Sequence, residues 1–113
     1  MRKTDKKRDN QLRQVLTEVC DAALEDIEGF QWLTHRVDYA RFPESLKVTC
    51  VFDTDGNLSA FLSGSHRDRL ALFIQNKLAD AGVDIKHMSA HINYDSEEQC
   101  EREHQGQWAR RLK

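Results

Sequence analysis

The chain has few of the residues that mark a linker, a disulfide scaffold or a membrane span. One proline and five glycines in 113 residues argue against a long linker or a low-complexity tract. Its three cysteines, Cys20, Cys50 and Cys100, are widely spaced and form no CxxC pair, which favours buried thiols in a reducing compartment. There is no apolar run long enough to cross a bilayer and no signal-peptide core. We therefore expect a cytoplasmic protein that makes no contact with a membrane.

Charge is unevenly distributed along the chain. The net charge is −2, yet residues 1–13 hold six basic residues against two acidic ones. We expect residues 1–8 to form a flexible, basic N-terminal arm and residues 9–113 to form a single domain. Two interpretations of the arm stay open at this point: a solvated tail, or a contact with a polyanion through Lys3, Lys6, Lys7 and Arg8.

Three segments carry the apolar spacing of amphipathic helices. The first runs from about Asp9 to Glu28, where eight apolar residues follow 3–4 spacing and Gly29 ends the helix. The second runs from about Ser65 to Ala81 and ends at Gly82. A third, capped by Asp95 or Ser96, has a thinner stripe formed by Cys100, His104, Trp108 and Leu112, and Gly106 weakens its second half.

The remaining apolar segments alternate with a period of two and predict strands. They are residues 30–39, residues 46–62 and residues 83–94. Within 46–62, Thr54-Asp55-Gly56 predicts a tight three-residue loop, so that this segment becomes a β-hairpin in which Phe52 pairs with Leu58. The resulting order is α-β-β-β-α-β-α. It predicts the α+β class, with a mainly antiparallel sheet packed with helices.

Two apolar residues lie outside the main core if residues 46–62 form the predicted hairpin. Val51 and Phe61 point to the opposite face of the expected hairpin. They lie either under the third helix or, with Trp108, on a surface for a protein partner, including a second copy of the chain.

Two further groups are candidates for ligand binding. His87 and His91 on the last strand, with Cys100 and His104 on the last helix, have the ligand types of a zinc site, although nothing in the spacing makes the two pairs converge. Arg67 and Arg69 lie at the start of the second helix, where backbone N–H groups favour an anion. The alternatives are solvated histidines, a packed Cys100 and an ordinary helix cap.

Motifs of catalysis are lacking. The chain has no nucleophile elbow, no glycine-rich phosphate loop and no paired acids with an identifiable site. We therefore expect a protein that binds rather than catalyses, with no cofactor.

Six segments carry a resemblance that extends over the whole chain: MRKTDKKRDN, VLTEVC, GFQWLTH, FPESLKV, CVFDT and QWARRLK. Through these segments the chain resembles a family of short gammaproteobacterial proteins of uncharacterised function, sometimes labelled Fis-family transcriptional regulators. A Fis-like protein would carry a helix-turn-helix near its C-terminus, but here a predicted strand separates the last two helices. The first helix, three strands and second helix are similar, in order alone, to a double-stranded RNA-binding domain.

Two hypotheses about function follow from the sequence. The leading one is a small accessory or regulatory protein that contacts nucleic acid or a ribonucleoprotein through Lys3, Lys6, Lys7 and Arg8, with Arg67 and Arg69 as a second contact. The alternative is a protein-interaction module, including a homodimer, that uses Val51, Phe61 and Trp108. A zinc protein is the third hypothesis.

Overall fold

A computed structural model describes residues 2–112. Its elements, in chain order, are α1 (Lys3–Asp26), β1 (Phe30–Arg36), the 3-10 helix η1 (Tyr39–Arg41), β2 (Lys47–Phe52), α2 (Asp55–Ser63), α3 (His66–Asp80), the 3-10 helix η2 (Met88–His91), β3 (Ile92–Ser96), α4 (Glu97–His104) and α5 (Trp108–Arg111). Among the described residues, no helix combines the length and the apolar character that a bilayer crossing requires.

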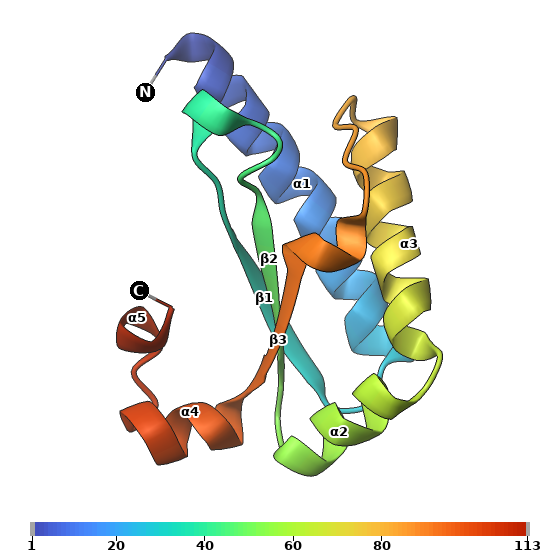
Figure 1. Ribbon diagram of the computed structural model, residues 1–113, viewed down its shortest axis with the longest axis vertical. Coiled ribbons are helices and arrows are strands. Elements are labelled where there is room, and N and C mark those ends of the chain that lie inside the picture. The colour runs from blue at the N-terminus through green and yellow to red at the C-terminus, as the bar shows by residue number, and fades with distance from the viewer. Residues whose placement is uncertain (1, 113) are drawn as a thin grey trace.

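The three strands form one mixed sheet in the order β1-β2-β3 (Figure 1). β1 is antiparallel to β2, and β2 is parallel to β3. Parallel neighbours need a crossover connection, which α2 and α3 supply. The protein therefore belongs to the α+β class, as the sequence predicts, although only one of the two strand pairs is antiparallel.

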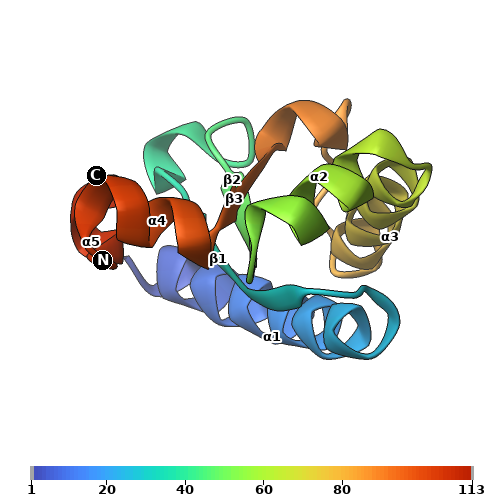
Figure 2. The same cartoon turned by 90° about the horizontal axis from the view of Figure 1, so that it is seen from below.

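The two faces of the sheet are covered differently. Val48, Cys50 and Phe52 of β2 point to the face that packs against α1, α2 and α3, and all three are fully buried in the main core. The side chain between them, Val51, points to the other face, where α4 and α5 lie. Figure 2 shows α4 and α5 on one side of the strands and α2 and α3 on the other. The alternation predicted for residues 46–52 is confirmed.

A β-bulge changes the alternation at the start of β1. Phe30 pairs with Phe52 and Trp32 pairs with Val51, so Gln31 is the extra residue. Because of this insertion, Phe30 and Leu33 both face the main core although they are three residues apart. Trp32 is left on the opposite face, beside α5.

The first helix is longer than the sequence predicts. It begins at Lys3 rather than near Asp9, so the residues expected in a flexible arm form its first two turns. Its buried residues follow the predicted stripe: Leu12, Val15, Leu16, Val19 and Ala23. The basic residues have good helix propensity, and the packed stripe behind them supplies a nucleus from which the helix extends.

The predicted β-hairpin is wrong. Thr54 is the N-cap of α2, and its hydroxyl accepts a hydrogen bond from the backbone N–H of Asn57. Leu58 and Phe61 are buried at helical spacing, whereas Ala60, which a strand would bury, is exposed. Phe52 pairs with Phe30 and Ser96 instead of Leu58. This change also removes the similarity in element order to a double-stranded RNA-binding domain.

The last third of the chain differs from the prediction in its boundaries. The sequence predicts a strand over residues 83–94, but the observed strand, β3, covers only Ile92–Ser96. The residues before it form a loop and η2. Val83, Ile85 and Met88 are nevertheless buried in the main core. The last helix begins after Ser96, whose hydroxyl accepts from the N–H of Gln99 as a cap, and it is split into α4 and α5 at Gln105 and Gly106, which both have positive φ.

Candidate functional site

A groove of about 880 Å³ lies on the face of the sheet that carries α5. It extends from the ends of β1 and β2 to the first half of α1 on one side and to α5 on the other. We call it the sheet groove. Its lining residues are Asp9, Arg13, His35, Arg36, Val37, Asp38, Tyr39, Ser45, Lys47, Thr49, Asn93, Arg111 and Leu112.

Positive charge predominates in the sheet groove. Its lining holds four cations, Arg13, Arg36, Lys47 and Arg111, against two carboxylates. Arg13 and Arg111 are neutralised by ion pairs within the chain. Arg36 and Lys47 instead donate to backbone carbonyl oxygens, to Leu112 over 2.7 Å and to Ala90 over 3.1 Å, respectively. Among the described residues, neither of these two makes an ion pair.

A polar cluster around Asp9 forms the wall of the groove nearest α1. The carboxylate accepts from Arg13 Nε over 2.7 Å and from the Tyr39 hydroxyl over 2.9 Å, and His35 Nε2 lies 3.7 Å from it. The hydrogen bond from Arg13, assisted by that from Tyr39, lowers the pKa of Asp9. Burial lowers the pKa of His35, with Asp9 opposing the shift. Burial and the bond to Asp9 raise the pKa of Tyr39 to about 12.

These shifts move the three groups away from neutral pH. At pH 7, Asp9 is an anion, His35 is neutral and Tyr39 keeps its proton. A general acid or base works best with a pKa near the working pH. The hydrogen bond from the Tyr39 hydroxyl to Asp9 therefore holds η1 against α1.

A second polar network holds α4 and α5 against the sheet. Glu97 accepts from both tryptophan indoles, from Trp32 Nε1 over 2.5 Å and from Trp108 Nε1 over 2.9 Å. The two rings meet edge to face with centroids 4.8 Å apart. Arg111 donates to both carboxylate oxygens of Asp95 and to Glu103, and its pKa is raised chiefly by the bonds to Asp95. This network, the Glu97 clamp, includes Arg111, which lines one end of the sheet groove.

The basic residues of the N-terminal segment lie at the same end of the molecule as the sheet groove. Lys3, Lys6 and Lys7 are exposed on the first turns of α1. Arg8 lies over the Phe42 ring, 4.8 Å from its centroid, and Phe42 stacks on Tyr39. A smaller hollow lined by Arg2, Thr4, Asp5, Arg8, Tyr39 and Ala40 shares Tyr39 with the groove. The structure thus joins the basic end of α1 to the groove.

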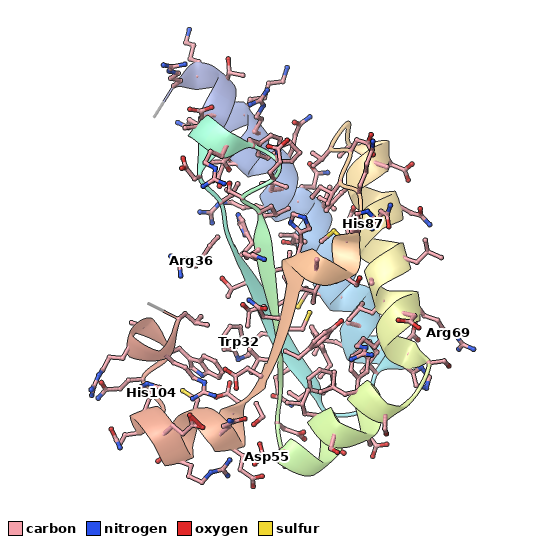
Figure 3. All side chains as sticks on the ribbon, viewed as in Figure 1. Trp32, Arg36, Asp55, Arg69, His87 and His104 are labelled. Carbon is pink, nitrogen blue, oxygen red and sulfur yellow. The ribbon has the colours of Figure 1, made fainter. Side chains whose placement is uncertain are left out.

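Arg67 and Arg69 are not part of this surface. They are exposed in the first turn of α3, and the start of α3 and the start of α1 lie at opposite ends of the molecule's long axis (Figures 1 and 3). Figure 3 shows Arg69 beyond α3 and Arg36 on the other side of the strands. One continuous surface of the N-terminal cations with Arg67 and Arg69 is therefore not formed within one copy.

The predicted partner surface is buried. Val51 is fully buried under α4 and α5, and Phe61 packs against Phe52 and Tyr94 in the main core with 5% of its surface exposed. Trp108 is half-buried against Trp32. The prediction placed Phe61 on a strand; as a residue of α2 it turns inward. These three residues do not form an exposed patch.

The four candidate zinc ligands are dispersed. His87 is exposed beside α3 in Figure 3, whereas His104 lies on α4 at the other side of the molecule and approaches Arg111. His91 Nδ1 is 2.7 Å from the carbonyl oxygen of Leu46. Cys100 is buried, and burial raises the pKa of its thiol. Residues 2–112 contain no cluster of three or more groups able to hold a metal ion.

Arg36 and Lys47 were missed by the sequence reasoning. Each lies at the end of a strand segment, and each has the parity that places it opposite the core face. That parity was a usable signal. Their juxtaposition could not be predicted, because the sequence left the strand order open and the predicted hairpin paired residues 46–52 only with the segment that follows them.

The chain matches no family model, and no curated protein or solved structure shows significant similarity to it. The interpretation of the site therefore depends on its own geometry and charge.

Proposed function

We propose that this is a non-catalytic cytoplasmic protein that binds the phosphate backbone of nucleic acid, either free or within a ribonucleoprotein. The contact is made by the basic end of α1, formed by Lys3, Lys6, Lys7 and Arg8. Three free cysteines suit the reducing compartment that this proposal requires.

The observation that carries the proposal is the placement of Lys3, Lys6 and Lys7 on a helix. Residues spaced i, i+3 and i+4 lie on one helical face, so the three ammonium groups are presented together. The same helix continues into the core, where Leu12 and Val19 are fully buried. The cations are therefore ordered before binding, which reduces the entropy lost when a ligand is bound.

The position of these cations works against helix stability. Positive side chains are unfavourable near a helix N-terminus, where the macrodipole is already positive, and like charges at i, i+4 repel each other. Among the described residues, Lys3, Lys6 and Lys7 make no ion pair that would relieve this repulsion. A polyanion laid along this face would relieve both effects.

The test is a fluorescence anisotropy titration of labelled single-stranded RNA and duplex DNA at two salt concentrations. A triple variant, Lys3→Gln with Lys6→Gln and Lys7→Gln, should retain the fold because all three side chains are exposed. Loss of three phosphate contacts should reduce the slope of log K against log salt by about 2.7 on duplex DNA and about 2 on single strands. For duplex DNA, the loss of affinity between about 50 and 200 mM salt should therefore be about 40 times smaller in the variant than in the natural sequence.

The matched control replaces three exposed cations elsewhere, Arg67→Gln, Arg69→Gln and Lys86→Gln. It removes the same charge from positions outside the basic end of α1, so a general effect of net charge would affect both variants equally. The proposal requires the α1 variant to lose clearly more affinity than the control. Equal losses, a larger loss in the control, or an absence of salt-dependent binding by the natural sequence would each overturn it.

A further inference from the structure

We infer that the sheet groove holds a discrete phosphate site, in which Arg36 and Lys47 together bind one phosphate group. The inference rests on the proposed function and deepens it, because it adds a defined point of attachment to a diffuse basic helix. The ligand chemistry is a phosphate ester, either a phosphodiester of the nucleic acid backbone or a terminal phosphomonoester.

The first argument is the direct apposition of two like charges. Arg36 and Lys47 are partners in the antiparallel β1–β2 register, and residues directly opposite one another point to the same face. Like charges in such a cross-strand pair destabilise a sheet. An anion bound between the two side chains would convert this repulsion into attraction.

The second argument is how the four cations of the groove are partnered. Arg13 and Arg111 donate to carboxylates of Asp9, Asp95 and Glu103. Arg36 and Lys47 donate only to neutral carbonyl oxygens, and both are exposed. An anion adds a direct Coulomb attraction to these two cations that a neutral carbonyl oxygen does not supply. A phosphate entering the groove would therefore compete well for these two donors.

The third argument is the variety of donors around the pair. Thr49 and Asn93 are partners on the next position of the same face, where β2 meets β3, and both line the groove. A guanidinium, an ammonium, a hydroxyl and an amide are thus available within one groove. A tetrahedral phosphate group presents its oxygens in several directions, whereas the two oxygens of a carboxylate lie in one plane.

The size of the groove shows that phosphate alone would not fill it. At about 880 Å³ it has room for a nucleotide unit or more. The two tryptophans nearest to it face each other and bind Glu97, so they are not free to stack on bases. The proposed recognition therefore uses the phosphate and not stacking of a base on a tryptophan.

The experiment is an amide chemical-shift titration of the full chain with inorganic phosphate at constant ionic strength. Saturable shifts in the millimolar range should appear at the amides of Arg36, Lys47, Thr49 and Asn93. Adenosine 5′-monophosphate should produce the same shifts, whereas adenosine should not. The double variant Arg36→Gln with Lys47→Gln should weaken phosphate binding by about tenfold or more.

The matched control removes two exposed cations outside the groove, Arg41→Gln and Lys86→Gln, and should retain phosphate binding. Shifts that rise without saturation, or that persist in the Arg36/Lys47 variant, would overturn the site. The Lys3/Lys6/Lys7 variant separates the two proposals, since it should lose nucleic acid affinity but still bind inorganic phosphate. Phosphate binding without nucleic acid binding refutes only the proposed function. Oligonucleotide binding that leaves the groove amides unshifted refutes only the site.

Discussion

Replacing Glu97 by glutamine should loosen the C-terminal segment, because one carboxylate serves two indole donors. Glu97 Oε1 accepts from Trp32, and Oε2 accepts from Trp108. Glutamine has the same shape but only one acceptor oxygen, and its amide N–H groups cannot accept. In Glu97→Gln, one indole N–H must lose its partner, and the remaining bond is no longer assisted by charge.

The expected cost follows from the burial of the three residues. A hydrogen bond to a charged group contributes about 1.5–3 kcal/mol, and an unsatisfied donor adds to the loss when it is buried. Trp32, Glu97 and Trp108 are each partly exposed, so water can replace some of what is lost. We therefore expect the free energy of unfolding to fall by about 1.5 kcal/mol, with a melting temperature lower by about 5–10 °C.

Urea unfolding followed by far-UV circular dichroism and by tryptophan emission measures both parts of this prediction. Both tryptophans belong to the Glu97 clamp, so emission should shift to the red at a lower urea concentration than the loss of helix. Glu101→Gln is the matched control, since Glu101 is an exposed residue of the same helix. If the two variants unfold alike, within about 0.5 kcal/mol, the clamp does not stabilise the segment as we argue.

Three other predictions concern the backbone, the core and pH. In urea unfolding, Gly29→Ala should destabilise the protein by clearly more than Gly82→Ala. Both glycines have positive φ, but a Cβ at Gly29 would lie 2.6 Å from Asn57 Cβ, whereas a Cβ at Gly82 meets nothing within 4 Å. Equal losses of stability would show that the close approach at Gly29 does not matter. Phe61→Ala should lower the free energy of unfolding by about 3–5 kcal/mol, measured in the same way. Leu72→Ala, at a residue that is 57% exposed, should lower it by less than about 0.5 kcal/mol. A mild effect at Phe61 would contradict its burial. Burial lowers the pKa of His35, so the unfolded chain binds a proton on this ring more strongly than the folded chain does. The stability that the neutral ring contributes is therefore complete above the unfolded pKa of about 6.5 and is lost as the pH falls toward the folded pKa. Denaturation at pH 7 and at about pH 5 should show a decline that is smaller in His35→Gln, and an unchanged decline would mean that other groups cause it.

The helices that could be predicted well are those with long stripes. In α1 and α3, apolar residues repeat over several turns, and no strand pattern fits them as well. Residues 54–62 are too short for this distinction, since Leu58 and Leu62 fit both periods. The burial of Phe61 and the exposure of Ala60 separate the two, and both depend on tertiary contacts. Thr54 also suits a helix N-cap as well as it suits a turn, and in the structure its hydroxyl accepts from the backbone N–H of Asn57.

The site could be predicted only in part, because it depends on pairing between distant segments. The basic composition of residues 3–8 was visible, but its helical order depends on the packing of α1. Arg36 and Lys47 meet through the β1–β2 register, and Trp32 meets Glu97 across a separation of 65 residues. No local pattern encodes contacts of this kind. The separation of His87 from His104 could not be predicted for the same reason, because it depends on how distant segments pack.

The central place of β2 has a consequence for synthesis on the ribosome. One edge of β2 pairs with β1, which is made first, but the other edge waits for β3, which is made about 40 residues later. At about 5–20 residues per second, the backbone N–H and C=O groups of this edge stay unpaired for about 2–8 s. During that interval the nascent chain presents a strand edge open to wrong partners. Chaperone contact with this short-lived intermediate is therefore expected to be concentrated on chains that end between β2 and β3.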